Sequence, residues 1–295
     1  MIEYMKIVKF YGGLGNQLFQ YAMLVAVREH YGDETLMDTS VYASYGLHNG
    51  LEITRIFNIT AQEATQEQIQ KISRFTTNYK LSRIFHYLLP AKRTEFKEHT
   101  FGRYYPEVMQ MQGDCLFDGY WQHHEYFANC REAILKEFSL REPLNKTNID
   151  CFESYSKSEK FVSIHVRRGD FLNSKLYRGL CGKEYYVAAI KKAIEIVGED
   201  VYFVFFSNDI PWCKENLASL VKNGHCTFVT HNTGADSYKD MILMSACRVN
   251  IIANSSFSWW GAYLNQRNDK VVIAPKKWIN KDMPNPIQMP EWIKL

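Results

Sequence analysis

The chain has 295 residues, 46% of them hydrophobic and 15% aromatic, a composition that excludes general disorder and predicts one large or two ordinary globular domains. Its formal net charge of +3 comes from 35 basic residues scattered against 32 acidic ones, which is too small and too dispersed to indicate nucleic-acid binding. Seven cysteines without a CxxC pair argue against a disulfide framework and a structural zinc site, and predict free thiols in a reducing cytosol.

The first half predicts an α/β domain over residues 1–145. A strand over 6–10 leads into the turn Gly12-Gly13-Leu14-Gly15, and a helix with apolar residues at helical spacing follows. The remaining expected elements are strands over 35–37 and 115–119, helices over 64–73 and 125–137, and a basic, aromatic patch near 80–96.

The second half predicts another α/β domain, over residues 159–295. Residues 139–158 are polar, contain Pro143 and lack periodicity, so we interpret them as a linker. Strands and helices then alternate, which indicates right-handed βαβ units and a parallel sheet. The expected strands are 161–165, 201–206, 226–230, 248–252 and 270–274, the expected helices are 184–197, 211–221, 238–246 and 256–265, and the proline-containing tail is expected to be irregular.

No apolar run approaches the roughly 20 residues that cross a bilayer, and no signal peptide is recognisable at the N-terminus. We therefore expect a cytoplasmic protein. The mildly basic charge is also compatible with peripheral attachment to the inner membrane.

The segment His165-Val166-Arg167-Arg168-Gly169-Asp170 directly follows a buried strand. Ligands bind at the carboxyl ends of strands in open α/β sheets, and two guanidinium groups with a carboxylate to hold one of them suit a diphosphate. The alternative is a surface turn held by a salt bridge.

The glycine turn after the first strand opens a helix, a context that suits a phosphate at the free N–H groups of the helix N-terminus. A dinucleotide fingerprint would require a third glycine where Leu18 stands, although Asp38 follows the next strand, where a ribose-binding acid would lie. Asn16 and Gln17 carry amides suited to a sugar hydroxyl or a phosphate. The alternative is a tight turn with no ligand.

Three further groups follow strands of the second half or lie near them. Asn254, Ser255, Ser256 and Phe257 offer either helix capping or an anion site. Ser207 and Asp209 end another strand of the same half, where the alternative to a ligand site is a helix N-cap made by Asn208 or Asp209. Asp240 is either part of the polar face of a helix or a carboxylate that accepts hydrogen bonds from the N1–H and N2–H₂ edge of guanine.

Several motifs are missing from the sequence. It contains no D-x-D metal clamp, no helical zinc pair, no G-x-S-x-G and no Walker lysine. The charge of a bound diphosphate would therefore fall to arginines, and we expect no metal and no cofactor.

Taken together, the chain resembles the α-1,2-fucosyltransferases of glycosyltransferase family eleven. The matching stretches occur in order along nearly the whole chain: GGLGNQLFQYA (12–22), DGYWQ with Tyr126-Phe127 (118–127), HVRRGD (165–170), FFSND with Trp212 (205–212) and DMILMSACRVNIIANSSFSWWGAYLN (240–265).

The resemblance implies an α/β, GT-B-like fold in which two Rossmann-like domains face a central cleft. It implies an acceptor-side N-terminal domain with the GGLGNQ loop, a C-terminal domain that binds GDP-L-fucose, and no metal requirement. The reaction would be an inverting transfer of L-fucose from GDP-β-L-fucose to the 2-OH of a terminal galactoside, in the synthesis of surface polysaccharide or O-antigen. The implied partners are this donor and a galactose-terminated acceptor, with no nucleic acid.

The resemblance also implies roles for individual residues. Arg167 would stabilise the leaving phosphate, Arg168 would support the loop or the second phosphate, and His165 and Asp240 would lie near the guanine. The full implied donor set is Gly13, Gly15, Asn16, Gln17, His165, Arg167, Arg168, Ser207, Asp209, Asp240, Asn254, Ser255, Ser256 and Phe257. Tyr120, Trp121 and Gln122 are acceptor-binding candidates, and Asp170 and Asn16 are further catalytic candidates. Asp38, Asp118 and Glu125 are unranked candidates for the general base.

Three alternatives stay open at this stage. One is another metal-independent, nucleotide-sugar-dependent transferase of the same architecture. Another is an NAD-dependent oxidoreductase that uses the glycine turn and Asp38, which would leave the two arginines unexplained. The third is a saccharide-binding protein without a diphosphate site.

Overall fold

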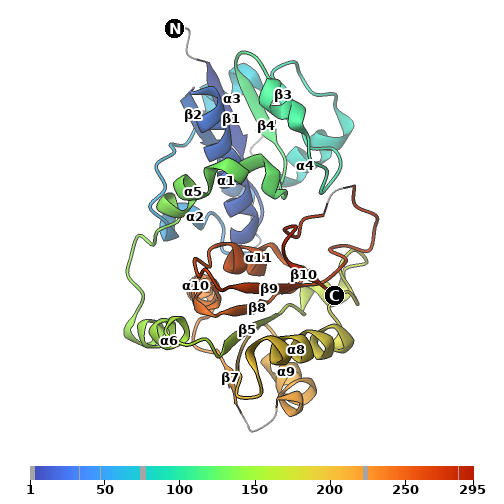
Figure 1. Cartoon of the computed structure of the whole chain (residues 1–295). Coiled ribbons are helices and arrows are strands. Elements are labelled where there is room, and N and C mark those ends of the chain that lie inside the picture. The colour runs from blue at the N-terminus through green and yellow to red at the C-terminus, as the bar shows by residue number, and fades with distance from the viewer. Residues whose placement is uncertain (1–3, 33, 47, 74–77, 222–224, 285) are drawn as a thin grey trace. The chain divides into compact units, whose positions relative to one another are not determined.

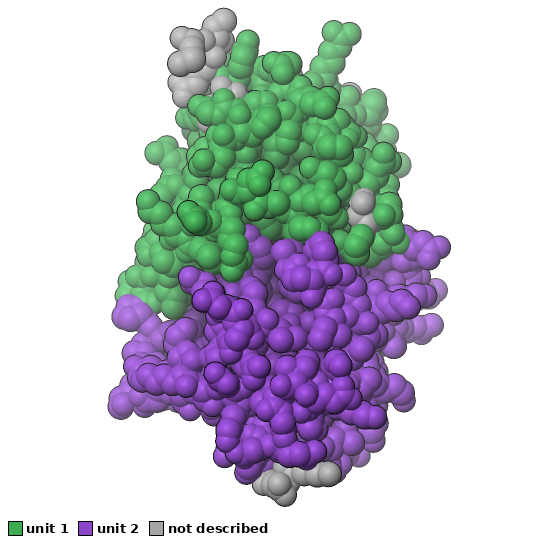
Figure 2. Space-filling view, in the orientation of Figure 1, with its two compact units in different colours: residues 1–142, 283–287 green, residues 143–282, 288–295 purple. Residues whose placement is uncertain are grey.

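The computed structural model describes residues 4–32, 34–46, 48–73, 78–221, 225–284 and 286–295. The chain divides into two compact units (Figure 2). Unit 1 comprises residues 1–142 and 283–287, and unit 2 comprises residues 143–282 and 288–295. Each unit has its own parallel β-sheet with helices packed against it (Figure 1).

The described strands of unit 1 form a four-stranded sheet in the order β2-β1-β4-β3, and each neighbouring pair is parallel. The strands are β1 (Met5–Lys9), β2 (Glu34–Asp38), β3 (Glu95–Lys97) and β4 (Cys115–Asp118). The α-helices are α1 (Leu14–Tyr31), α2 (Ile53–Ile56), α3 (Gln66–Ile72), α4 (Tyr79–Leu88) and α5 (Arg131–Glu137). Short 3₁₀ turns are η1 (Ser40–Ser44), η2 (Pro106–Gln110) and η3 (His124–Cys130).

Helix α1 lies in the interior of unit 1, and every residue from Leu18 to Val27 is buried. A helix that is apolar on nearly all sides is expected to be buried in this way. It ends where Gly32 adopts φ 65°, a left-handed conformation that glycine reaches without a Cβ penalty. The glycine turn therefore lies between a buried strand and a buried helix.

The described strands of unit 2 form a six-stranded sheet in the order β10-β9-β8-β5-β6-β7, and each neighbouring pair is parallel. The strands are β5 (Phe161–Val166), β6 (Tyr202–Ser207), β7 (Cys226–Phe228), β8 (Val249–Ile251), β9 (Val271–Ala274) and β10 (Ile293–Lys294). The α-helices are α6 (Lys146–Ser156), α7 (Asp170–Asn173), α8 (Lys183–Val197), α9 (Ile210–Asn216), α10 (Tyr238–Ala246) and α11 (Ser256–Tyr263), with 3₁₀ turns η4 (Ala218–Leu220) and η6 (Gly234–Asp236).

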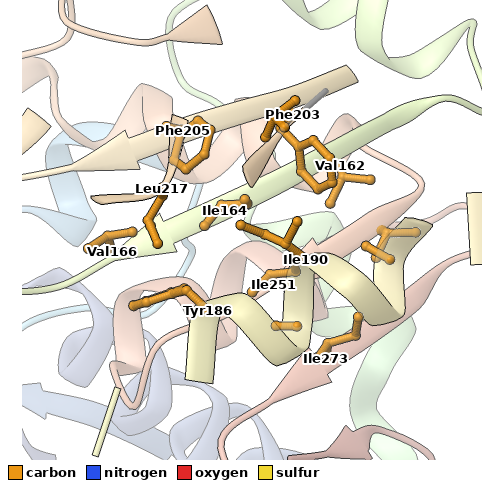
Figure 3. Packing of buried hydrophobic residues seen from close by; sticks show 14 of the residues in the cluster. Val162, Ile164, Val166, Tyr186, Ile190, Phe203, Phe205, Leu217, Ile251 and Ile273 are labelled. Carbon is orange, nitrogen blue, oxygen red and sulfur yellow. The ribbon is translucent and has the colours of Figure 1, made fainter. Parts of the chain in front are cut away.

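Strand β5 runs through the centre of the unit 2 sheet, and its residues are buried from Val162 to Val166. Figure 1 shows α8 and α9 on one side of this sheet and α10 and α11 on the other. Figure 3 shows Val162 and Ile164 packing in one apolar cluster with Tyr186 and Ile190 of α8. The continuous apolar strands that the sequence displays are those of a parallel sheet covered on both faces.

The predicted linker over 139–158 is largely structured. Residues 146–156 form α6, which packs on α10 and belongs to unit 2. The helix showed no apolar periodicity because the polar Asn148 is fully buried while Ile149 is exposed. The Asn145 side chain caps the helix by accepting a hydrogen bond from the Asn148 N–H at 3.0 Å.

Two other expectations were wrong in detail. The single helix expected over 125–137 is η3 followed by α5, because Phe127 has φ −129° and breaks the helical conformation. The tail expected to be irregular ends in β10, which pairs parallel to β9. In addition, β3 and α4 occupy the region that the sequence analysis described only as a basic, aromatic patch.

Among the described residues, none of the helices combines the length and the apolar composition needed to span a bilayer.

Candidate active site

The sheet of unit 2 changes direction between β5 and β8. From β5 the chain proceeds to β6 and β7 on one side, and then crosses to β8, β9 and β10 on the other. Such a topological switch point opens a crevice at the carboxyl ends of the two central strands, where open α/β sheets bind ligands. The segments that follow β5 and β8 here are residues 167–170 and residues 252–257, the two stretches that the sequence analysis selected.

Arg168 is held firmly by groups that follow β6. Its Nε donates to Asp209 at 2.9 Å, and its backbone N–H donates to the Asn208 side chain at 2.9 Å. The guanidinium carbon lies 4.1 Å from the centre of the Trp212 ring, within cation–π distance. Arg168 is thus engaged on several sides and ties the loop after β5 to the segment after β6.

Arg167 is held more loosely. Its Nη2 forms an ion pair with Asp170 at 2.8 Å, and Asp170 is more than half exposed. Its Nε is buried and has no hydrogen-bond partner among the described residues. A guanidinium with an unused buried donor and an exposed counter-ion can exchange that partner for the oxygens of an anionic ligand.

His165 is a buried, neutral ring at the end of β5. Burial, reinforced by the charge of Arg167, lowers the pKa of the imidazole to about 3. Its carbonyl accepts a hydrogen bond from the Tyr186 hydroxyl at 3.0 Å, while its buried Nδ1 is without a partner in the described part of the chain. The ring lies 5.7 Å from that of Phe257, so the two segments flanking the switch point touch here.

The N-terminus of α11 lies beside this contact. Ser255 is the N-cap residue, and its side chain makes no capping bond within the described residues. The first turn contains no acidic residue, so the helix dipole favours an anion at this end. Asn254, in contrast, is buried and donates to the Trp278 carbonyl at 3.1 Å, which makes it a support for the loop.

Ser207 and Asp209 were predicted to bind the donor, and both make hydrogen bonds within the protein. The Ser207 hydroxyl donates to the Val166 carbonyl at 2.8 Å and accepts the Asp209 N–H at 2.9 Å. Asp209 pairs with Arg168 and accepts the Trp212 N–H at 3.2 Å, as the cap of α9. Through these bonds both residues position the arginine loop.

Asp240 lies on α10, and burial raises the pKa of its carboxyl to about 7, although a hydrogen bond from Asn232 opposes the shift. Asn232 Nδ2 donates to Asp240 at 2.9 Å and also to Asn148 on α6, whose own amide donates back to Asn232 at 2.9 Å. This network orients the Asp240 carboxyl. It was missed in the sequence because its two asparagines lie 84 positions apart.

Unit 1 has a second switch point, between β1 and β4. The glycine turn follows β1, and Gln122, which follows β4, donates to the Asn16 side chain at 2.7 Å. Asn16, a donor-binding and catalytic candidate, and Gln122, an acceptor-binding candidate, therefore meet at the carboxyl edge of the unit 1 sheet. Gly13 is the N-cap residue of α1 and Gly15 lies in its first turn.

Gln17 was predicted to bind the donor, but its side chain is engaged inside unit 1. Its side-chain nitrogen donates to the carbonyls of Gly12 and Gly50, at 3.0 and 2.8 Å, and its oxygen accepts the N–H groups of Glu52 and Ile53, at 2.9 and 3.0 Å. All four hydrogen-bonding positions of the amide are thus used inside unit 1. Gln17 ties the turn to the following loop and has no capacity left for a ligand.

Trp121 was predicted to bind the acceptor, but its side chain lies in the core of unit 1. It is fully buried, and its ring packs against those of Phe96, Phe117 and Tyr126. It is part of the aromatic core of unit 1 and does not present a sugar platform. Its neighbour Tyr120 is half-buried, and its hydroxyl accepts a hydrogen bond from Arg83 at 3.2 Å.

The carboxylates considered as general bases lie in different environments. Asp38 and Asp118 are buried at the ends of β2 and β4, and Asp38 accepts the Ser40 N–H at 3.0 Å. Glu125 is exposed. The sequence analysis overlooked Glu98, a buried carboxylate that accepts the Tyr120 N–H at 2.6 Å. Burial raises the pKa of the nearby Tyr11 hydroxyl, and the negative charge of Asp118 adds to this effect.

Over the described ranges, no three His, Cys, Asp or Glu side chains gather in a way that could hold a metal ion.

Gly169 explains how the arginine loop turns. It has φ 53° and ψ −113°, and a Cβ placed there would lie 2.6 Å from the Asn208 amide nitrogen. We expect Gly169→Ala to lower the free energy of unfolding by more than about 2 kcal/mol and to displace Arg168.

The control for this prediction is Gly179→Ala. Gly179 also has a positive φ, 79°, but a Cβ there would meet nothing within 4 Å, so about 1 kcal/mol is expected. Urea unfolding of both variants measures the difference. Equal losses would show that the contact with Asn208 does not constrain the loop.

Comparison with solved structures supports the architecture. The fucosyltransferase NodZ from Bradyrhizobium superposes with a TM-score of 0.54 over 89% of this chain and 92% of its own, at 14% identity. Two α/β units with parallel sheets, each with polar residues at its switch point, define a glycosyltransferase fold of the GT-B type.

The family is equally clear. The model of glycosyl transferase family 11 matches residues 3–295, and the chain belongs to this family. The O-antigen biosynthesis glycosyltransferase WbnK of Escherichia coli is 32% identical, over 96% of this chain and 98% of its own. An alpha-1,2-colitosyltransferase of Escherichia coli is also 32% identical, over 98% of each chain. The galactoside alpha-(1,2)-fucosyltransferase 1 of Lagothrix lagotricha is 25% identical, over 96% of this chain and 72% of its own.

Proposed function

We propose that this glycosyltransferase transfers L-fucose from GDP-β-L-fucose to the 2-OH of a terminal galactoside, with inversion at the anomeric carbon. The observation that carries this proposal is the arrangement after β5. Arg168 is engaged by Asp209 and Trp212, while Arg167 keeps a buried, unused donor at the switch point. This division of labour suits one arginine that builds the loop and another that meets the leaving diphosphate.

In this mechanism the acceptor 2-oxygen forms a bond to C1 of the donor sugar and loses its proton to water late in the step. The bond between C1 and the phosphate oxygen breaks, and GDP leaves with that electron pair. Arg167 stabilises the charge that develops on the phosphate, and the N–H groups at the start of α11 assist it. Asp170 forms an ion pair with Arg167, so the role we give this catalytic candidate is to orient the guanidinium and not to act as the general base.

We assign the guanine of the donor to the surroundings of His165 and Asp240. The neutral imidazole and Phe257 offer flat, apolar surfaces. Asp240, when ionised, accepts the two N–H donors of the guanine edge, which adenine and uracil cannot supply in that arrangement. A nucleotide-sugar transferase with another base is the competing function, and it would not depend on this carboxylate.

The donor sugar has a second candidate. A colitosyltransferase is as similar to this chain as the O-antigen glycosyltransferase is. Colitose is fucose without its 3-hydroxyl, so the two donors share the nucleotide, the diphosphate and the anomeric chemistry. The setting we propose is the assembly of surface polysaccharide or O-antigen on the cytoplasmic side of the inner membrane, with no metal required.

The test is GDP release in the presence of EDTA, with lactose as acceptor. GDP-fucose, GDP-colitose and GDP-mannose are compared, each with and without acceptor. Acceptor-dependent release from GDP-fucose is the expected result. Faster release from GDP-colitose would reassign the donor, dependence on added Mg²⁺ would contradict the metal-free mechanism, and equal rates without acceptor would show hydrolysis alone.

A further inference from the structure

Helix α4 is oriented with its polar side toward the protein. Ser82 is buried and accepts a hydrogen bond from Lys9 Nζ at 2.6 Å. Arg83 donates to the Tyr120 hydroxyl at 3.2 Å, and its guanidinium lies 5.8 Å from the centre of the Tyr11 ring. Surface helices of globular proteins normally bury their apolar side, so this orientation is reversed.

The outer side of α4 carries the apolar residues. Their spacing of i, i+3, i+4 and i+7 forms one continuous stripe along the helix. The exposed fractions are 45% for Leu81, 48% for Ile84, 37% for Phe85 and 74% for Leu88, and Tyr87 beside them is 60% exposed. Other large apolar side chains that are exposed in the described part of the chain occur singly in their elements, and such scattered residues are ordinary.

The charge around the stripe is of one sign. Residues 78–93 contain Lys80, Arg83, Lys92 and Arg93 and no Asp or Glu. This segment therefore carries +4, while the remaining 31 basic and 32 acidic residues of the chain sum to −1. Of these cations, Arg83 faces the protein and Lys92 Nζ donates to the Ser73 carbonyl at 3.1 Å, while Lys80 and Arg93 are exposed.

We propose that α4 and the basic residues after it dock unit 1 on an anionic lipid bilayer. A helix with a basic polar rim and an exposed apolar stripe lies in the membrane interface, with the stripe among the acyl chains and the cations among the headgroups. A second copy of the chain fits less well, because the exposed cations of two copies would repel each other at close range. The proposal does not depend on which donor sugar the enzyme uses.

The test is co-sedimentation of the full chain with vesicles of phosphatidylglycerol mixed with phosphatidylcholine, compared with phosphatidylcholine alone. The wild-type protein should bind the anionic vesicles far more tightly, and salt should weaken that binding. Ile84→Gln/Leu88→Gln should weaken it at least tenfold, because the stripe loses its apolar surface. Lys80→Gln/Arg93→Gln should weaken it about thirtyfold, since each cation contributes about fivefold.

The matched control replaces two exposed apolar residues of unit 2, as Ile149→Gln/Val187→Gln, and should bind like the wild type. All variants should release GDP from GDP-fucose at the wild-type rate with the soluble acceptor lactose, which separates docking from catalysis. Equal binding to both vesicle types, absence of binding, or unchanged binding by the α4 variants would overturn the proposal. So would a dimer on gel filtration that the α4 substitutions dissociate, because the stripe would then serve a second copy.

Discussion

Arg167→Ala should lower the turnover number by about 10²–10³ while leaving the midpoint of thermal unfolding nearly unchanged. The magnitude is that of removing one preorganised donor from charge that develops in a transition state. The stability should hold because the ion pair of Arg167 with the exposed Asp170 and the approach of its guanidinium carbon to within 5.4 Å of the Phe171 ring centre each contribute no more than about 1 kcal/mol. Steady-state GDP release and thermal unfolding measure the two effects.

The neighbouring arginine gives the contrast. Arg168→Ala should lower both activity and stability, because it removes the contacts with Asp209 and Trp212 that hold the loop. Lys192→Ala removes another cation of an i,i+3 pair, with Glu195 on α8, and should change neither quantity. Arg167→Ala with wild-type turnover would remove this residue from the mechanism.

Asp170→Asn distinguishes the two roles of that carboxylate. As an orienting partner of Arg167, it should reduce turnover modestly and keep the shape of the pH–rate profile. As a general base, its loss would remove the acidic limb of that profile. Turnover measured across the pH range decides between these outcomes.

The affinity for GDP-fucose should fall about tenfold between pH 8 and pH 6, through protonation of Asp240. The pKa of this carboxyl is raised to about 7 by burial, so it is mostly ionised at pH 8 and mostly protonated at pH 6. Only the ionised form accepts both guanine N–H groups. The diphosphate of GDP-fucose is a diester with no group that titrates in this range, which makes it a better probe than GDP.

Asp240→Asn should bind GDP-fucose at least tenfold more weakly at pH 8, with little change down to pH 6. His231→Gln is the matched control, because His231 contacts Asn148 of the same network without touching Asp240. That variant should keep the wild-type pH dependence. Calorimetric titration at three pH values provides the measurement, and a wild-type affinity independent of pH would contradict the guanine assignment.

The raised pKa of Asp240 also affects the free energy of unfolding. Ionising Asp240 favours GDP-fucose binding but disfavours the folded, ligand-free protein. Because the folded-state pKa of Asp240 lies above its value in the unfolded chain, about 3.9, ionising it disfavours the folded state. The ligand-free protein therefore gains stability from the protonated group below pH 4 and loses that gain as the pH rises through 7. Asp240→Asn should be more stable than the wild type at pH 8, by about 1–3 kcal/mol, and equal to it at pH 4.

The sequence predicted the strand-end clusters well because two independent patterns coincide there. Apolar runs that end abruptly in polar or glycine-containing segments mark buried strands of a parallel sheet, and the ends of such strands gather at one edge. The segments around Arg167, Ser255 and Asn16 were found in this way.

Polar side chains that serve the interior could not be distinguished from ligands. Gln17 and Ser207 stand beside true strand ends, yet their partners are backbone groups of distant segments that no local pattern reveals. Helix α6 escaped prediction because a buried Asn148 and an exposed Ile149 invert the usual pattern. In each case a tertiary contact overrides the local preference.

The close approach of Gly169 to Asn208 makes substitutions at these two distant positions depend on each other. A Cβ at position 169 would lie 2.6 Å from the Asn208 amide nitrogen, so a mutation there requires the Asn208 side chain to move or to be replaced. A shorter residue at 208, however, leaves the Arg168 N–H without its acceptor. Each single substitution is therefore harmful alone, and lineages that drift at one of these positions are expected to change both, together with a new way of holding the arginine loop.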